Sequence, residues 1–219
     1  MKIVNGIAII ENDEYLSKWV IDSGRLDHDQ NSLPIILEYI KEGYTVIDAG
    51  SNIGTHAIAY AKRVGGKGSV LCFEPNKNNF ECLEYNLNSY DHAELYNWGL
   101  SDESCNLKMK DVPTNAGMSY AEKSKKGIKC ITIDSLELDR LDFIKIDCEG
   151  FEHKILKGAE KTIKKFKPVM VIEINNFALN RNNTSDNDIY IYLNELGYTY
   201  RNIYPNESIY GEQLDILCI

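Results

Sequence analysis

The chain has 219 residues, 43% of them hydrophobic and 26% charged, with a formal net charge of −9 at pH 7. This length predicts a single α/β domain over residues 1–219, and the acidic balance excludes general attraction to nucleic acid or anionic membranes. Residues 123–129 are the one locally basic stretch, best interpreted as a solvated loop. No apolar run approaches the length of a membrane span, and we expect a soluble, cytoplasmic protein.

The first 43 residues precede the predicted catalytic core, residues 44–219, and we expect them to cover its site. Residues 2–10 and 18–22 alternate or run apolar around a polar turn, which predicts a hairpin. In the polar loop that follows, His28 and Asp29 are candidates for substrate contact, although an exposed loop is the simpler interpretation. Residues 33–40 then carry apolar side chains at helical spacing.

The most informative stretch is residues 44–64. Its apolar start predicts a buried parallel strand, and a helical pattern begins at Ile53. Between the two lie an acid and a glycine turn, formed by Asp48, Gly50, Asn52 and Gly54. Glycine lets the backbone turn tightly and approach a ligand closely, and a helix N-terminus offers free N–H groups. We therefore predict a cofactor loop, although an ordinary strand–turn–helix would share this pattern.

A second predicted strand, residues 69–74, ends in Glu74. This acid follows the loop by roughly 20–25 residues, where the ribose-binding acid lies in doubly wound folds. The loop is Gly50-x-Asn52-x-Gly54, whereas nicotinamide enzymes have G-x-G-x-x-G. Asp48 would also lie badly beside a pyrophosphate, but it suits the ammonium and sulfonium of S-adenosylmethionine. We predict that cofactor, with a nicotinamide-dependent oxidoreductase or a non-catalytic cofactor-binding module as alternatives.

The remaining chain continues to alternate helices with strands. Helical patterns are predicted at 76–88, in a long helix that follows the turn at 148–152 and ends at Pro168, and at 189–196. Strands are predicted at 94–100, 107–109, 128–133, 141–147, 169–174, 198–204 and 214–218. Residues 175–187 read as a polar loop, and residues 111–127 as a loop that could be a lid or plain surface. This order predicts an open, mostly parallel sheet.

Five acids stand at or just after predicted strand ends: Asp48, Glu74, Asp102, Asp147 and Glu173. In open parallel sheets, ligands bind beyond the carboxyl ends of the strands. Several carboxylates at one edge would repel each other unless a cofactor, substrate or metal compensated. We therefore expect the site at this edge.

Residues 46–54, 73–75, 100–102, 142–152 and 156–159 resemble the FkbM family of S-adenosylmethionine-dependent methyltransferases. The likeness covers about residues 45–175, with Ser51 where the family usually has alanine. It implies the Rossmann-like class I methyltransferase fold, a seven-stranded, mostly parallel sheet with one antiparallel strand and helices on both faces. It also implies O-methylation, commonly of a hydroxyl on a sugar, glycan or small natural product.

The resemblance also assigns cofactor contacts by position. It gives Glu74 the ribose hydroxyls and Asp102, beside Ser101, the adenine amino group. Without the resemblance, Asp102 could equally cap a turn or helix. The resemblance gives the methionine end of S-adenosylmethionine to the loop residues Asp48, Gly50, Ser51, Asn52 and Gly54.

A hydroxyl acceptor must be aligned with the methyl group and needs a base as its proton leaves. Asp147, at the end of the predicted central strand, is the first candidate, with Glu149, His153 and Glu173 in reserve. His153 could equally be a solvent-facing helix residue. No metal site is predicted, because no cysteine or histidine cluster has zinc spacing. Asp147 and Glu149 could instead hold Mg²⁺.

Overall fold

The computed structural model describes residues 1–26, 31–110, 112, 114–115, 118–204, 207–209 and 213–219. His28, Asp29 and part of the 111–127 loop lie outside these residues, so their predicted roles are not examined by the structure. Within the described ranges, no helix is long and apolar enough to cross a membrane.

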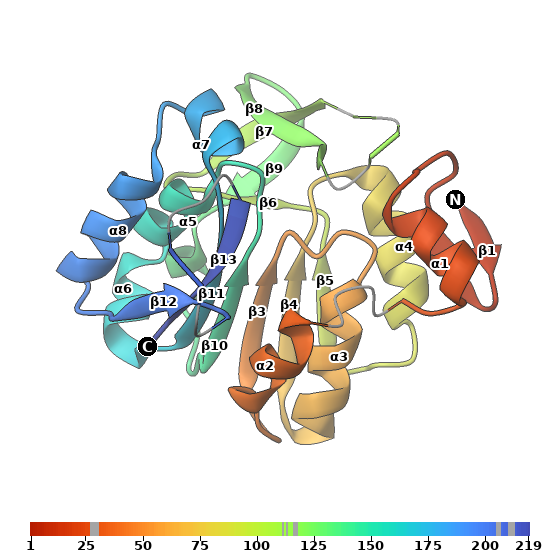
Figure 1. Ribbon diagram of the computed structural model, residues 1–219, viewed down its shortest axis with the longest axis horizontal. Helices are drawn as coiled ribbons and strands as arrows, with labels where there is room; N and C mark the ends of the chain where they lie inside the picture. The colour runs from red at the N-terminus through yellow and green to blue at the C-terminus, as the bar shows by residue number, and fades with distance from the viewer. Residues whose placement is uncertain (27–30, 111, 113, 116–117, 205–206, 210–212) are drawn as a thin grey trace.

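A seven-stranded sheet lies at the centre of the molecule (Figure 1), in the order β12-β13-β11-β10-β3-β4-β5. Neighbouring strands from β11 to β5 are parallel, while β13 is antiparallel to both β11 and β12. The bounds are β3 Thr45–Ala49, β4 Ser69–Phe73, β5 Ala93–Tyr96, β10 Phe143–Ile146, β11 Val169–Asn175, β12 Tyr200–Asn202 and β13 Gln213–Cys218. The predicted sheet with one antiparallel strand is confirmed.

Side chains of the central strands alternate between two apolar clusters, one on each face of the sheet. Ile47 and Ile144 belong to one cluster, and Val46 and Phe143 to the other. The first cluster includes residues of α5 Glu152–Gly158, α6 Glu160–Phe166 and α8 Asp186–Glu195. The second includes residues of α2 Ser32–Glu38, α3 Thr55–Val64 and α4 Lys77–Leu87. Helices therefore cover both faces, as predicted.

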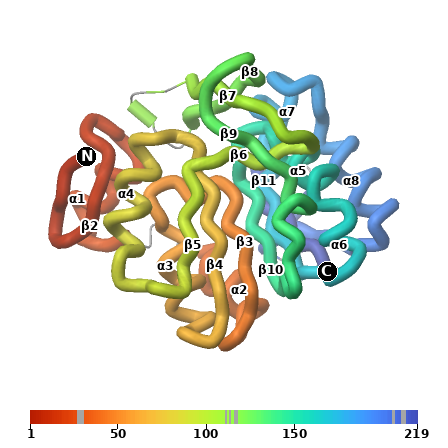
Figure 2. The backbone as a smooth tube through the Cα atoms, turned by 180° about the vertical axis from the view of Figure 1, so that it is seen from behind, coloured from red at the N-terminus to blue at the C-terminus, as the bar shows by residue number. Residues whose placement is uncertain are grey.

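A second sheet, in the order β6-β9-β7-β8, lies at the upper end of the main sheet in Figures 1 and 2. Its strands are β6 Gly99–Leu100, β7 Cys105–Lys110, β8 Tyr120–Ser124 and β9 Ile128–Ile131. The predicted antiparallel pairing of the strands at 107–109 and 128–133 is confirmed. β8 was not predicted, because it lies within the stretch interpreted as a loop.

The predicted strand at 94–100 is divided between the two sheets. The Asn97 side chain donates to the carbonyl oxygens of Glu74 and Pro75, at 2.8 and 3.1 Å, just after β5 ends. The chain then enters the second sheet at Gly99, where a Cβ would lie 2.4 Å from Leu107 Cδ1. Side-chain contacts across the fold therefore end the strand early.

The N-terminal hairpin is shorter than predicted. It joins β1 Lys2–Val4 to β2 Ile7–Ile9 through Asn5 and Gly6, both with positive φ, as a tight hairpin turn requires. Residues 18–22 are not a strand but part of α1 Leu16–Ser23. The reason is local, because the Asp13 carboxylate accepts the N–H of Ser17 at 2.6 Å and starts a helix there.

Two further helical predictions need correction. The predicted long helix breaks at Ala159 into α5 and α6, because Asp134 accepts the N–H groups of Lys161 and Thr162 at the start of α6. Residues 175–187 are not all loop, since they contain α7 Asn176–Arg181 and the start of α8. Two short 3-10 turns, Gly65–Lys67 and Ile133–Leu136, complete the regular elements of the described chain.

Candidate active site

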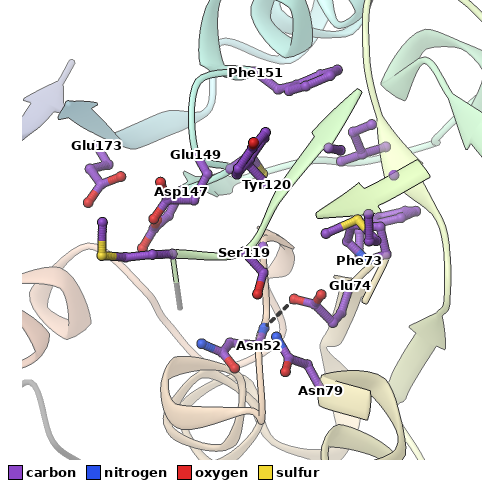
Figure 3. A pocket seen from close by; sticks show the side chains of 18 of the residues that line it. Asn52, Phe73, Glu74, Asn79, Ser119, Tyr120, Asp147, Glu149, Phe151 and Glu173 are labelled. Atoms are coloured by element: carbon purple, nitrogen blue, oxygen red, sulfur yellow. Dashed lines mark hydrogen bonds between the residues drawn. The ribbon is translucent and has the colours of Figure 1, made fainter. Parts of the chain in front are cut away.

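A cavity of about 510 Å³ opens at the carboxyl ends of the parallel strands (Figure 3). Asn52 and Glu74 line one side of it, and Asp147, Glu149 and Glu173 line another. Tyr15, Leu16 and Trp19 of the N-terminal segment, together with Met118 and Tyr120, also contribute to its wall. The edge predicted to carry the site therefore carries this cavity.

The loop between β3 and α3 has the shape that its glycines permit. Gly50 has φ +85°, and a Cβ there would lie 1.8 Å from the carbonyl oxygen of Asp147. Gly54 has φ +96°, and a Cβ there would lie 2.7 Å from Leu87 Cδ1. Glycine alone fits both positions, which lets the loop lie directly against the end of β10.

Glu74 ties this loop to the start of α4. Its Oε2 accepts the Asn52 N–H at 2.8 Å, and its Oε1 accepts the Asn76 N–H at 2.7 Å. Burial raises the pKa of Glu74 to about 7, although both N–H donors oppose that rise. The carboxylate has further lone pairs and lines the cavity, so it can accept hydrogen bonds from a ligand.

Asp48 and Ser51 are buried in the loop and are not among the cavity-lining residues. Ser51 Oγ donates to the Asp48 carbonyl oxygen at 2.9 Å, which braces the turn. Asp48 Oδ2 has no hydrogen-bond partner among the described residues. Burial raises the pKa of Asp48, and the nearby charge of Lys145 opposes the rise.

A buried lysine controls the charge of Asp147. Lys145 Nζ lies 2.5 Å from Asp147 Oδ2, and only 3% of the Lys145 side chain is exposed. Burial acts to raise the pKa of Asp147, but the Lys145 ammonium outweighs it and brings the pKa below its usual range. Burial and the Asp147 charge raise the pKa of Glu173 well above its usual range. The two neighbouring carboxyl groups therefore have pKa values shifted in opposite directions.

Glu149 lies in a strained turn that points it toward the cavity. Its backbone has φ +50°, a left-handed conformation that residues other than glycine rarely adopt. Glu152 Oε1 accepts the N–H groups of Cys148 and Gly150, at 2.9 and 3.1 Å, which shapes this turn. Burial raises the pKa of Glu149 to about 7, with Asp147 adding to the rise and Arg181 opposing it.

Besides Asp48 and Ser51, the predicted site residues that do not line the cavity are Gly54, Ser101, Asp102 and His153. Asp102 accepts a hydrogen bond from Ser101 Oγ at 2.9 Å and lies 3.7 Å from Lys123 Nζ. The His153 ring packs edge-on against Tyr192 of α8, with centroids 5.7 Å apart. In the described part of the chain, no three His, Cys, Asp or Glu side chains are grouped to hold a metal.

Sequence reasoning missed Lys145 and the aromatic wall of the cavity. A lysine within the otherwise apolar strand β10 was the available signal for the first. No comparable local signal marks Trp19 or Tyr120, which reach the cavity only through the packing of α1 and β8.

The strand order and the cavity at the strand ends define a class I methyltransferase fold. A methyltransferase structure from Aquifex aeolicus aligns with TM-score 0.52 and 16% identity, covering 93% of this chain and 95% of that one. The FkbM methyltransferase structure from Methylobacillus flagellatus aligns with TM-score 0.54 and 18% identity, covering 94% and 60%. These likenesses confirm the predicted fold class.

The family model described as the methyltransferase FkbM domain matches residues 48–200. The chain therefore belongs to the FkbM methyltransferase family, as its motifs predict. This family membership confirms S-adenosylmethionine, rather than a nicotinamide, as the cofactor class. The hexuronic acid methyltransferase AglP of Haloferax volcanii is 29% identical over 150 residues, or 65% of this chain. The alignment spans 61% of that relative's length.

Proposed function

We propose that this chain transfers a methyl group from S-adenosylmethionine to a hydroxyl on a sugar or glycan acceptor. The observation that carries the proposal is the single cavity in which Asn52 and Glu74 lie opposite Asp147 and Glu149. The hexuronic acid specificity in the name of the Haloferax relative supports a sugar acceptor. A small natural product would present the same hydroxyl chemistry.

The polar atoms around the loop fit this cofactor. Asp48 Oδ2, Asn52 Oδ1 and Asn79 Oδ1 are buried without a hydrogen-bond partner in the described part of the chain. Buried oxygens of this kind are destabilising unless a donor reaches them. The ammonium and hydroxyl groups of S-adenosylmethionine are such donors, whereas a pyrophosphate carries only acceptors.

The proposed cofactor contacts follow from this arrangement. Asp48 and Asn52 would take the methionine end, Gly50 and Gly54 shape the loop with Ser51, and Glu74 would accept the ribose hydroxyls. The cavity also has an apolar part lined by Phe73, Trp98 and Leu100. We place adenine there, so Ser101 and Asp102 would act from outside the cavity wall.

Bound S-adenosylmethionine supplies a methyl group on a sulfonium, which is already an activated electrophile. The chain must therefore hold the acceptor hydroxyl in line and remove its proton. Glu149 replaces Asp147 as the proposed base, because a pKa of about 7 suits proton transfer near neutral pH. Asp147, held ionised by Lys145, would orient the acceptor hydroxyl by accepting a hydrogen bond.

The N-terminal segment would keep water from this chemistry. Tyr15, Leu16 and Trp19 line the cavity, and the Glu14 N–H donates to the Thr114 carbonyl oxygen at 2.9 Å. This bond joins the N-terminal segment to the chain that leads into β8. It supports the proposal that residues 1–43 cover a catalytic core formed by residues 44–219.

Methyl transfer can be tested with S-adenosylmethionine labelled in its methyl group and p-nitrophenyl β-D-glucuronide as the acceptor. Mass spectrometry should show one added labelled methyl group on the sugar. Parallel incubations with glycan, protein and RNA fractions should place the label in the glycan fraction. Label found only in protein or RNA would contradict the sugar acceptor. Cofactor binding without transfer to any fraction would favour the non-catalytic binding module.

A further inference from the structure

Arg181, in α7, lies beside the cavity and contacts Glu149, Tyr120 and Phe177. Its Nη2 atom lies 3.2 Å from Glu149 Oε2. The guanidinium carbon lies 4.3 Å from the Tyr120 ring centroid and 5.2 Å from that of Phe177. Contact of a guanidinium with two aromatic rings restricts where it can lie. The two rings therefore help to hold Arg181 Nη2 beside Glu149.

The backbone of α7 is docked on the turn that carries Glu149. Gly150 has φ +102°, and a Cβ at that position would lie 2.2 Å from the Ala178 carbonyl oxygen. No side chain fits there, so the first turn of α7 packs directly against the turn. Glu149 keeps its left-handed conformation between this helix and the hydrogen bonds of Glu152.

We propose that Arg181 is a positioning residue for methyl transfer, which holds the Glu149 carboxylate in the cavity ready to accept the acceptor proton. The inference rests on the proposed function, in which Glu149 is the base. Tyr120 connects the two roles, because it lines the cavity and also packs on Arg181. The second sheet and α7 would thus jointly fix the base.

The charges around Glu149 show what Arg181 contributes. The charges of Asp147 at the end of β10 and Glu152 on α5 raise the pKa of Glu149, and the charge of Glu149 in turn raises the pKa of Glu173 on β11. Arg181 is the cation that opposes them. Removing its charge should raise the pKa of Glu149 above about 7, so that the base ionises only at higher pH.

A titration that needs no acceptor tests directly whether Arg181 lowers the pKa of Glu149. Carbon-13 NMR of protein labelled at the glutamate carboxyls would follow Glu149, with its signal assigned by its loss in Glu149→Gln. The midpoint should lie near pH 7 in the wild type and move higher in Arg181→Gln. Arg181→Lys keeps the charge and should stay near the wild-type value. Arg140→Gln is the matched control, because that exposed arginine pairs with Asp142 at the other end of β10.

Turnover with p-nitrophenyl β-D-glucuronide gives the second readout. In Arg181→Gln, kcat should fall by about tenfold at pH 7 and recover only in part as the pH rises, because the ring contacts are lost as well as the charge. The cofactor KM should not change. Arg181→Lys should lose turnover at every pH, because an ammonium cannot make the guanidinium's contacts with both rings and Glu149 together.

An unchanged Glu149 midpoint in Arg181→Gln would overturn the proposal, as would an equal loss of turnover at every pH in that variant. If Arg181→Gln does not fold, wild-type turnover in Arg181→Lys would overturn it, and the predicted loss would support it. If the wild type transfers no methyl group, the proposed function is refuted. A shifted Glu149 midpoint in Arg181→Gln would then still show that Arg181 controls the charge of Glu149.

Discussion

The two sides of the cavity are built in different ways. The proposed cofactor side, with Gly50, Asn52 and Glu74, comes from one loop and the end of the adjacent strand, and backbone groups shape it. The proposed acceptor side brings together Trp19, Tyr120 and Glu149, which line the cavity, and Arg181, which contacts Glu149, from four separated segments. Backbone geometry determines the first side, and tertiary packing determines the second.

Because of this difference, the two sides of the cavity can change independently of each other. The cofactor loop depends on glycines and on hydrogen bonds to backbone N–H groups, so its requirements are local. The acceptor side can change with α1, β8 or α7 and leave the loop intact. The family match begins at residue 48 and so excludes Trp19 and the rest of the N-terminal segment. We expect variants on the two sides to affect different measurements.

The largest effect is expected from Glu149→Gln on the acceptor side. Removing the proposed base should lower kcat by about 10²–10⁴-fold, the usual range for a general base. Cofactor affinity should stay within about twofold, since the cofactor side is untouched. The exposed Glu84 on α4 supplies the matched control, Glu84→Gln, which should keep wild-type turnover. Full activity in Glu149→Gln would remove the acceptor side from the mechanism.

Glu74→Ala should produce the opposite pattern. A charged hydrogen bond is worth about 1.5–3 kcal/mol, so if Glu74 binds the ribose as proposed, equilibrium dialysis should show cofactor binding weakened by that much for each bond lost. Glu74→Asp should be intermediate, because its charge remains but its reach is shorter. Wild-type affinity should also fall as the pH drops below about 7, where Glu74 becomes protonated. Unchanged affinity in a folded Glu74→Ala protein would make this acid structural.

Gly50→Ala tests the backbone basis of the cofactor side. The positive φ alone should destabilise the protein by about 1–3 kcal/mol, and the contact with the Asp147 carbonyl oxygen adds to that. Gly43→Ala is the matched control, because Gly43 has φ +80° with nothing within 4 Å of its Cβ position. Chemical denaturation should show a greater loss for Gly50→Ala than for Gly43→Ala. Equal losses would mean that the close approach is unimportant.

In their dependence on pH the two sides should behave alike. Burial raises the folded-state pKa of Glu74 and of Glu149 to about 7. A raised carboxyl pKa gives stability that is full below the unfolded pKa and lost as pH rises through the folded pKa. Without ligand, the free energy of unfolding should therefore increase as the pH falls from about 8 to 5. Glu74→Gln should flatten that increase, and an unchanged slope would contradict the buried-carboxyl assignment.

The smallest effect is expected at His153. Its ring packs on Tyr192 and is not among the cavity-lining groups, so His153→Ala should change kcat by less than about threefold. Some loss of thermal stability should accompany the lost aromatic contact. A loss of turnover comparable to that of Glu149→Gln would return His153 to the list of candidate bases.

The loop of the proposed cofactor side could be predicted from sequence because its causes are local. Two glycines, the apolar strand before them and an acid after the next strand are all visible in the chain itself. The parallel sheet follows from the same alternation of apolar strands and helices. The fold class could therefore be predicted without knowledge of side-chain contacts.

The proposed acceptor side could not be predicted from sequence, because it depends on tertiary packing. α1 begins where Asp13 accepts the Ser17 N–H, and α7 is a short helix in a polar stretch. Arg181 lies beside Glu149 because α7 packs on Gly150. His153 lies three residues after Gly150 in sequence, but α5 places its ring against Tyr192 of α8, which the sequence alone did not indicate.

Calorimetric titration with S-adenosylmethionine tests the central claim most directly, because it separates the two sides in one measurement. The wild type should bind one equivalent at pH 8 and show no heat with NAD. Glu149→Gln should bind with the wild-type affinity, and Glu74→Ala should bind much more weakly. Binding of NAD with no response to S-adenosylmethionine would contradict the account, as would equal loss of affinity in both variants.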